Sequence, residues 1–416
     1  MSEMSYLEKL LDGVEVEWKA VGDIAGYSTT KVDADKLDAT SFVGVDNLLA
    51  DKGGRIDATY QPNTARLTAY EPGDILLGNI RPYLKKVWMA ENNGGCSGDV
   101  LAIRILADCK KIISPEYLYY ALSSDSFFSY SMQHAKGAKM PRGSKDAILN
   151  YQIPIPCPSA PGKSLAIQSE IVRILDKFTA LTAELTAELN MRKKQYNYYR
   201  DQLLSFKDGE VEWKTLGEIG DFTYGYAAKA MDSGDARFVR ITDINKDGKL
   251  SKENPMYVEL NEENEKYTLD KNDLLMARTG ATFGKTMIFE EDYPAVYAGF
   301  LIKLNLNKTI INAKYYWHFA QSDFFWEQAN KLVSGGGQPQ FNANALKQVR
   351  VPIPYPSHPQ KSLDEQGRIV DILDKFDAIA ASITEGLPRE IELRQKQYEY
   401  YRDLLFSFPK PDSVTN

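Results

Sequence analysis

RKKQYNYYRDQLLSF, at residues 192–206, returns as RQKQYEYYRDLLFSF at residues 394–408. The two segments agree at 11 of their 15 positions, which is more than unrelated segments of this length share. An internal repeat determines the architecture, because each copy is a structural unit that recurs. The pair therefore predicts a chain of two tandem halves, divided near residues 207–210.

Further repeated segments occur in the same order along both halves. They are VEWKAVGDI (16–24) with VEWKTLGEI (211–219), SFVGVDNL (41–48) with RFVRITDI (237–244), GDILLGNIRPYLKK (73–86) with NDLLMARTGATFGK (272–285), IPIPCPSAPGKSL (153–165) with VPIPYPSHPQKSL (351–363), and EIVRILDKF (170–178) with RIVDILDKF (368–376). The similarity is strong in the closing segments and weak before them. We interpret this as one scaffold that carries two different heads.

Each head is predicted to be an α+β domain. Short apolar runs bounded by Gly, Asn and Asp, such as DILLGNI (74–80) and DLLMAR (273–278), indicate strands and turns. Helical patterns follow at matching places, at residues 115–128 and 313–330. The scaffold and the heads together predict an α+β fold with two globular domains.

Alternating prolines close each head, in IPIPCPSAP and VPIPYPSHP. Proline fixes an extended backbone and is excluded from central strands and helix interiors, so we expect these segments to be exits from the heads and not parts of the core. A serine follows each one. Ser164 and Ser362 are predicted N-caps of the helices that follow, and Glu365 would complete a capping box with Ser362.

Two long helices are predicted after these serines, because apolar residues recur there at alternating spacings of three and four, as in a coiled-coil seam. Pro388 should break or kink the second helix. Without a core of their own, the helices are expected to pack on each other, antiparallel, with pseudo-two-fold symmetry. The predicted packing residues are Ile171, Phe178, Leu185, Tyr196, Tyr199 and Leu203 in the first helix, and Ile369, Phe376, Ile383, Tyr398, Tyr401 and Leu405 in the second.

TAELTAEL, at residues 182–189, repeats four residues inside the first helix. Four residues advance an α-helix by about 400°, so one copy adds about 6 Å of length while it turns the seam by only about 40°. The number of copies therefore sets a length without dismantling the seam. The predicted spacer-setting residues are Thr182, Leu185, Thr186 and Leu189.

Composition excludes several classes of protein. Three cysteines and three scattered histidines suggest neither a disulfide framework nor a metal site. No segment approaches the roughly 20 apolar residues of a membrane span, and the first residues do not resemble a signal peptide, so we expect a cytoplasmic protein without a membrane partner. FGKT (283–286) lacks the spacing of a phosphate loop. We predict no catalytic residue.

Two long segments are free of acidic residues, although the net charge of the chain is −7. Residues 126–145 contain four basic residues and no acid, and residues 328–363 contain no Asp or Glu. Such segments are typical of loops that face a polyanion, because local charge decides binding to nucleic acid. Two ordinary solvated loops would show the same pattern.

The combination of two unlike heads, nearly identical helical segments, PIPxP, LDKF, TAEL repeats and QY-x-YYRD-x-L-x-SF resembles the specificity subunit of type I restriction-modification systems. The resemblance covers essentially the whole chain. It implies that each head is a target recognition domain that reads one half of a split, asymmetric target in double-stranded DNA. It also implies that relatives differing in copies of TAEL read differently spaced sites.

The resemblance implies partners as well. The helices would dock two modification subunits, which methylate adenine N6, and restriction subunits would join through them. S-adenosylmethionine, ATP and Mg are expected on these partner subunits, and no cofactor on this chain, which would not be an enzyme by itself. The implied segments are a first target recognition domain at 1–160, a central conserved helical region at 161–207, a second target recognition domain at 208–358 and a C-terminal conserved helical region at 359–416.

Base-reading residues are predicted from side-chain chemistry, because Arg pairs with guanine, Asn or Gln pairs with adenine, and Lys mainly contacts the backbone. The candidates are Arg81, Lys85, Lys139 and Arg142 in the first head, and Arg278, Lys285, Gln338 and Gln340 in the second.

Two alternatives remain open. NPMY (254–257) weakly resembles the Asn-Pro-Pro-aromatic loop of amino-methyltransferases, and a degenerate DNA methyltransferase would bind S-adenosylmethionine by itself. A coiled-coil scaffold without DNA contact would leave no footprint on a duplex.

Overall fold

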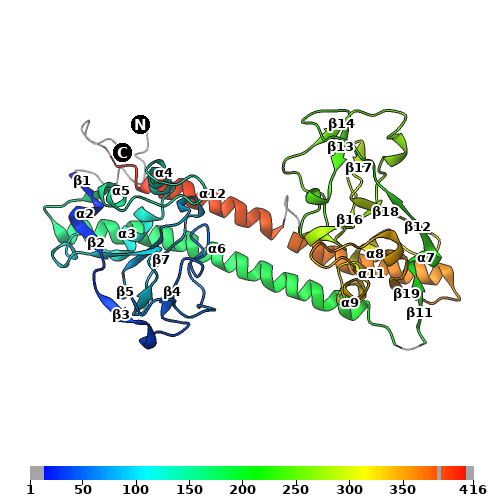
Figure 1. The fold of residues 1–416 in the computed structure, drawn as a ribbon, viewed down its shortest axis with the longest axis horizontal. Helices are drawn as coiled ribbons and strands as arrows, with labels where there is room; N and C mark the ends of the chain where they lie inside the picture. Colours follow the sequence, from blue (N-terminus) through cyan, green and yellow to red (C-terminus); the bar gives the residue numbers. More distant parts are fainter. Residues whose placement is uncertain (1–13, 208, 382–385, 409–416) are drawn as a thin grey trace, which may run out of the picture. The chain divides into compact units, whose positions relative to one another are not determined.

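A computed structural model describes residues 14–207, 209–381 and 386–408. The chain divides into two compact units (Figure 1). Unit 1 comprises Met1–Ala183 and Glu392–Asn416, and unit 2 comprises Glu184–Ile391. Each unit contains one head, the beginning of one long helix and the end of the other.

The head of unit 1 contains short strands followed by three helices. Its elements are β1 (Val16–Ala20), α2 (Val21–Ile24), β2 (Ala25–Tyr27), β3 (Lys31–Asp33), β4 (Phe42–Val43), β5 (Arg66–Tyr70), β6 (Ile75–Gly78), η2 (Pro82–Leu84), β7 (Val87–Met89), β8 (Gly94–Cys96), β9 (Val100–Ile105), α3 (Pro115–Leu122), α4 (Asp125–Gln133), α5 (Lys145–Asn150) and β10 (Gln152–Pro156).

The head of unit 2 repeats this order with one strand fewer among the described residues, since two strands instead of three lie between the counterparts of β2 and β6. Its elements are β11 (Val211–Thr215), α7 (Leu216–Ile219), β12 (Gly220–Tyr224), β13 (Ala236–Val239), β14 (Tyr257–Val258), β15 (Leu274–Ala277), η6 (Gly280–Thr282), β16 (Thr286–Ile288), β17 (Ala295–Tyr297), β18 (Leu301–Leu306), α8 (Ala313–Phe319), α9 (Asp323–Leu332), α10 (Ala343–Lys347) and β19 (Arg350–Pro354).

In each head, one four-stranded antiparallel sheet is buried on both faces. Its order is β2-β9-β6-β7 in unit 1 and β12-β18-β15-β16 in unit 2. Successive side chains of a strand point to opposite faces. Ile75 and Leu77 therefore pack toward the helices, whereas Leu76 packs toward a second sheet of order β3-β5-β8-β4. Leu274 and Leu275 divide in the same way in unit 2. The predicted α+β heads are confirmed.

The proline segments are strands of the core. β10 pairs antiparallel with β1, placing Pro154 opposite Trp18, and β19 pairs with β11, placing Pro352 opposite Trp213. Each pair is a two-stranded sheet, so no proline lies in a central strand. Ile153 is nevertheless buried. The prediction that these segments are exits outside the core is wrong, because the residues between the prolines keep the N–H groups that a ladder needs.

The long helices start earlier than predicted. α6 (Pro161–Leu203) and α11 (Pro359–Ala381) begin at prolines, which suit the first helical position because their missing N–H is not needed there. Ser164 and Ser362 lie inside the first turns and are buried. The predicted N-caps and capping box are therefore wrong, and Glu365 instead pairs with Arg368.

The same two serines help to fasten each helix to its head. In unit 1, Gln168 Nε2 donates to Ser164 Oγ at 3.0 Å and to Ile112 O at 2.7 Å, and Gln168 Oε1 accepts from Ser114 N at 3.0 Å. In unit 2, Gln366 makes the equivalent bonds with Ser362 Oγ, Ile310 O and Asn312 N. A buried amide that satisfies a loop carbonyl and a loop N–H fixes the helix start against the head.

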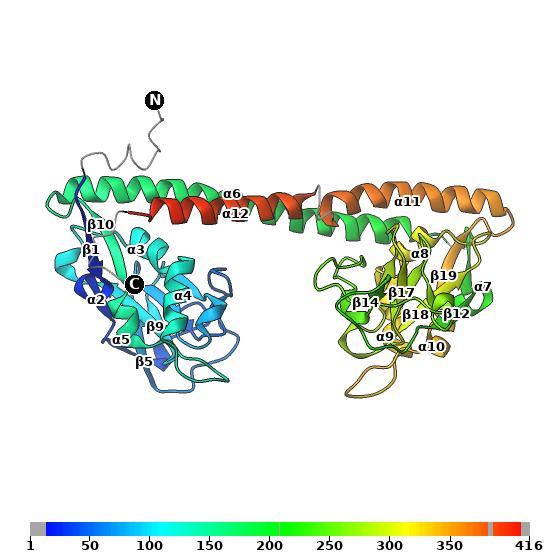
Figure 2. The same cartoon turned by 90° about the horizontal axis from the view of Figure 1, so that it is seen from above.

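α6 is continuous through residues 182–189. The predicted interruption of the second helix is confirmed, because Gly386 lies in a bend and α12 (Leu387–Leu405) begins there with Pro388 in its first turn. Within each unit, the two helical segments run in opposite directions, as Figure 2 shows. Two equivalent ring stacks join them, each with centroids 5.2 Å apart: Phe178 with Tyr401 in unit 1, and Phe376 with Tyr199 in unit 2.

The other predicted packing residues lie at several depths. Ile171, Ile369, Tyr196 and Leu405 are buried, and Leu185, Leu203 and Tyr398 are half-buried. Ile383 lies outside the described residues.

Candidate DNA-recognition site

Two loops meet in the head of unit 1. Residues 136–142, between α4 and α5, form a hairpin in which Lys136 and Arg142 exchange backbone hydrogen bonds of 2.9 Å. We call this segment hairpin 1. The loop after β6 lies against it, since Arg81 N donates to Pro141 O at 2.7 Å and Ile80 bridges to Arg142. Two segments far apart in the sequence thus form one rigid edge.

The head of unit 2 repeats this backbone arrangement. Residues 334–340 form hairpin 2, closed between Ser334 and Gln340. The loop after β15 lies against it, since Gly280 N donates to Pro339 O at 3.0 Å and Thr279 bridges to Gln340. The scaffold of this edge is shared by the two heads, although the sequences of the hairpins differ.

Hairpin 1 is cationic. Lys136, Lys139 and Arg142 are exposed, as is the neighbouring Arg81. Arg142 Nη1 lies 3.0 Å from Asp99 Oδ1, but a surface ion pair of this kind is weak and can be exchanged for a phosphate. The structure therefore brings three of the four predicted residues of this head together on one exposed edge.

Hairpin 2 carries amides instead of cations. Its tip contains three glycines, of which Gly335 and Gly336 have positive φ values of 97° and 40°. This conformation favours glycine. Gln338 is exposed and Gln340 is half-buried. Hairpin 2 thus offers uncharged hydrogen-bond donors and acceptors, whereas hairpin 1 offers charged donors.

Arg278 is held beside hairpin 2 by two aromatic rings. Its guanidinium lies 5.3 Å from the ring centroid of Tyr224 and 5.4 Å from that of Phe300, and Phe341 N donates to its carbonyl at 2.8 Å. Both rings are exposed. Cation–π contact of this kind orients the fork of Arg278. The sequence analysis missed Tyr224 and Phe300, since only the fold places them next to Arg278.

Lys85 and Lys285 lie apart from the hairpin edges. Lys85 Nζ pairs with Asp125 Oδ1 at 2.7 Å, and Lys285 lines a cavity. Their contact with DNA stays a prediction that the geometry does not favour.

Asp125 is the centre of an ion cluster in unit 1. Its carboxylate accepts from Lys85 and, at 2.9 Å, from Arg402 Nη2, and Lys52 lies 3.5 Å away. The side chain of Arg402 is 0% exposed. Burial by itself would raise the pKa of Asp125, but the hydrogen bonds from Lys85 and Arg402 outweigh it and hold the pKa well below its usual value. This cluster fastens α12 to α4.

We expect Asp125→Ala to lower the free energy of unfolding by about 2 kcal/mol, because the buried Arg402 loses the carboxylate of the head and keeps only Asp403 of its own helix. Solvent at the partly exposed Asp125 reduces the full cost. Asp323→Ala is the matched control, since Ser322 caps α9 as Ser124 caps α4 but Asp323 is exposed. The control removes the same favourable charge at a helix N-terminus, worth about 0.3–1 kcal/mol. Denaturant unfolding measures both, and equal losses would mean that the cluster contributes nothing.

A second polar network joins head and helices in unit 2, at the place where Tyr120 Oη donates to Asp176 Oδ1 at 2.6 Å in unit 1. Tyr196 Oη lies 2.8 Å from His318 Nδ1, and His318 Nε2 lies 2.9 Å from Asp374 Oδ1. Burial lowers the pKa of His318, so we assign a neutral ring that accepts from Tyr196 and donates to Asp374. The heads differ in how they hold the same scaffold.

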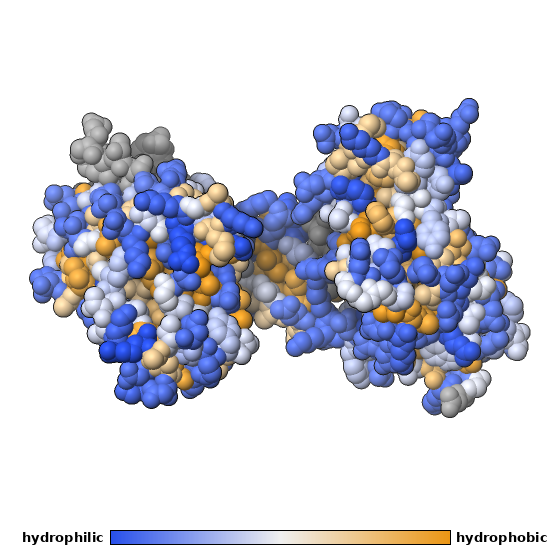
Figure 3. Space-filling model, in the orientation of Figure 1, coloured by the Kyte–Doolittle hydropathy of each residue, from blue (hydrophilic) through white to orange (hydrophobic). Residues whose placement is uncertain are grey.

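Hydrophilic residues predominate on the visible face of each unit, with apolar patches among them (Figure 3). Within the described ranges, no group of three or more His, Cys, Asp or Glu side chains is arranged to hold a metal ion. Of the helices in the same part of the chain, none is both long enough and apolar enough to cross a bilayer.

The comparisons with known proteins show the family. A family model, the type I restriction modification DNA specificity domain, matches residues 72–192 and 209–393. The chain is 41% identical over 440 residues to the EcoR124I/EcoR124II type I restriction enzyme specificity subunit of Escherichia coli, over the full length of both. It is 31% identical to a putative type I restriction enzyme specificity subunit of Haemophilus influenzae, over 97% of this chain and 98% of that one.

The fold is also found in a solved structure. The S subunit of a type I restriction-modification system from M. genitalium matches with a TM-score of 0.54 and 14% identity, over 98% of this chain and 100% of that one. The chain belongs to the family of type I restriction-modification specificity subunits.

Proposed function

We propose that this chain is the DNA-reading subunit of a type I restriction-modification complex. Each head reads one half of a bipartite, asymmetric target, hairpin 1 with Arg81, Lys139 and Arg142, and hairpin 2 with Gln338, Gln340 and Arg278. One observation carries the proposal. The same two-loop edge occurs in both heads, but it carries cations in one and amides in the other. A shared frame with different side chains is what reading two different half-sites requires.

The long helices complete this proposal. They fix the spacer between the half-sites and dock two modification subunits, through which restriction subunits join. The chain itself supplies no catalytic group. S-adenosylmethionine, ATP and Mg act on the partner subunits, and this chain determines where on the DNA they act.

A DNA footprint of the chain assembled with its modification subunits tests this function. We expect two protected patches separated by an accessible spacer, since two heads contact two half-sites. A single continuous patch, or no sequence-specific protection, would contradict the proposal. Absence of any footprint would instead favour the alternative that the chain is a coiled-coil scaffold without DNA contact.

The degenerate methyltransferase has little support. Asn254 and Pro255 are exposed, and the segment continues into the edge strand β14. A catalytic loop of that kind would have to line a pocket for an adenine, whereas NPMY lies outside the three cavities lined by Arg200, Arg104 and Trp18. Calorimetry of S-adenosylmethionine with the chain alone should therefore show no binding.

The charge of hairpin 1 leads to a quantitative prediction. Replacing Lys139 and Arg142 by Ala should weaken DNA binding by about tenfold and reduce the slope of log K against log salt by about 1 to 2, because fewer counterions are released. Lys110→Ala with Lys111→Ala removes equal charge from exposed positions of the same head outside the hairpin and should change neither quantity. Titrations at several salt concentrations measure both. An unchanged slope in the hairpin variant would remove hairpin 1 from the interface.

A further inference from the structure

The repeat allows each buried group of one unit to be compared with its counterpart in the other. Arg402 and Arg200 occupy the same position of the repeated YYRD segment, and their side chains are 0% and 5% exposed. Arg402 reaches across to Asp125 in the head. Among the residues that the structure describes, Arg200 finds acceptors within its own helix alone, Asp201 Oδ1 at 2.9 Å and Asn197 Oδ1 at 3.1 Å. The second buried arginine thus lacks the carboxylate that the head supplies to the first.

The head of unit 2 has an aspartate at the corresponding place, but it points elsewhere. Asp323 follows its N-cap serine as Asp125 does. Asp323 is exposed and does not line the space in front of Arg200. A cavity of about 300 Å³ lies there instead, which is at the lower end of the range of small-ligand sites.

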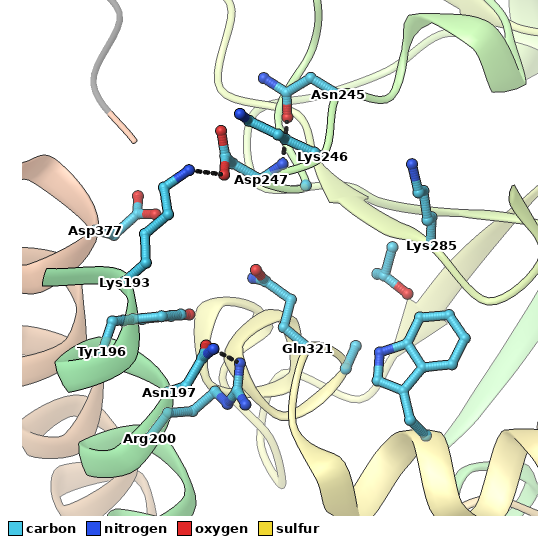
Figure 4. A pocket seen from close by; sticks show the side chains of 14 residues that line it. Lys193, Tyr196, Asn197, Arg200, Asn245, Lys246, Asp247, Lys285, Gln321 and Asp377 are labelled. Atoms are coloured by element: carbon cyan, nitrogen blue, oxygen red, sulfur yellow. Dashed lines mark hydrogen bonds and ion pairs between the residues drawn. The ribbon is translucent and has the colours of Figure 1, made fainter. Parts of the chain in front are cut away.

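The cavity is open on one side and is lined by α6, by Asp377 of α11 and by loops and helices of the head of unit 2 (Figure 4). The residues that matter for its chemistry are Lys193, Arg200, Asn245, Lys285, Gln321 and Trp326. Arg200 and Lys285 approach from opposite sides, and Gln321 lies between them (Figure 4). The walls therefore combine several cations and amides with an indole ring.

The cavity carries surplus positive charge. Four cationic side chains line it but only two carboxylates, Asp247 and Asp377. Asp247 is engaged by Lys193 at 3.2 Å, and Asp377 lies 3.5 Å from Lys249. Lys285 makes no ion pair with any residue that the structure describes. Charge of this kind, held between packed elements, favours an anion.

We propose that this cavity is a binding site for a phosphate group, with Arg200 as its fixed donor. Asp201 and Asn197 accept from Nε and Nη1 of Arg200, which holds the guanidinium in place and leaves Nη2 to donate to a phosphate oxygen. Lys285 adds a second charge from the opposite wall. The volume exceeds what a bare carboxylate needs and leaves room for a small ester whose ring lies against Trp326. A free phosphate ester, such as a mononucleotide, and a phosphodiester of bound DNA offer the same chemistry.

Calorimetry of the full chain with inorganic phosphate and with AMP tests this site. Both should bind saturably at low salt, AMP more tightly, and Arg200→Gln should weaken binding by about tenfold or more, the effect of losing charge-assisted hydrogen bonds. Because Arg200 is buried, a second variant is needed that keeps it. Gln321→Glu has nearly the same shape and places a carboxylate inside the cavity, as Asp125 does in unit 1.

Gln321→Glu should therefore abolish phosphate binding in a folded chain, whereas Gln321→Ala, which adds no charge, should retain it. If the AMP binding that Gln321→Glu abolishes persists in the assembled complex and a specific duplex does not displace it, the ligand is a free ester. If the duplex does displace it, the site holds a DNA phosphate. Absence of binding by both phosphate and AMP, or equal binding by the Gln321→Glu variant, would overturn the proposal. Because this titration contains no DNA, a negative result would overturn the phosphate site without contradicting DNA reading by the hairpins.

Discussion

A third TAEL copy inserted after Leu189 should lengthen the spacer of the recognised DNA by about one or two base pairs and leave both half-sites unchanged. The insertion adds about 6 Å to α6, and each base pair advances the duplex by about 3.4 Å. The second helix must adjust to the longer first one, so the full extension should not be transmitted. The continuity of α6 through residues 182–189 carries this prediction, since an insertion into an uninterrupted helix adds length along its axis.

The packing of α6 explains why the insertion should be tolerated. Leu185 and Leu189 are half-buried, and the residues between them are mostly exposed. Four residues turn the helix by about 400°, so the apolar stripe shifts by only about 40°. Inserting TAE alone is the matched control, because three residues turn the stripe by about 60° the other way and place no new leucine in it. We expect this control to impair assembly with the modification subunits.

Methylation mapping of the two-copy and three-copy forms measures the spacer directly. An identical spacer in both forms would show that α6 does not set the distance. Altered bases in either half-site would show that the insertion disturbs the heads.

Exchanging the first head for that of a relative should replace one half of the recognised sequence completely and keep the other half. The exchange should cover residues 1–160, so that β1 and β10, which pair with each other, come from the same parent. The core of this head is contained in unit 1. Hairpin 1 lies within residues 1–160 and is therefore exchanged together with the head. Selection of bound sequences from a random library measures the outcome.

The reciprocal exchange of residues 208–358 is the control for this experiment. It should change the other half-site and keep the first. If either exchange altered both halves, the heads would not read DNA independently, and the account of two separate readers would fail.

The scaffold was predictable from the sequence because it is periodic. Spacings of three and four placed Phe178 and Phe376 on helix seams, where each stacks on a tyrosine of the other helix. Helix boundaries were less predictable. Ser164 matches the local pattern of an N-cap, but it lies inside the helix, where its hydroxyl accepts from Gln168. Gln168 is held there because it also donates to the carbonyl of Ile112 in a neighbouring loop, a contact that the local sequence does not show.

The candidate site was predictable only in part, for a physical reason. The sequence predicts that Arg81 and Arg142 lie in loops, but their meeting on one edge depends on backbone hydrogen bonds between separate segments. Lys85 matched the same chemistry, yet Asp125 engages it from another element. The contact of Arg402 with Asp125 spans 277 residues of sequence. Side-chain chemistry limits which residues are candidates for DNA contact, but tertiary contacts determine which of these side chains are free to bind DNA.

The central claim is that one repeated scaffold presents two unlike readers at a fixed distance. Genome-wide mapping of methylated adenines, in a host that expresses this chain with its modification partner, tests the claim most directly. We predict one bipartite target with two different half-sites, a spacer of constant length and unspecified sequence, and a methylated adenine in each half. Identical half-sites, a continuous target or a variable spacer would contradict it.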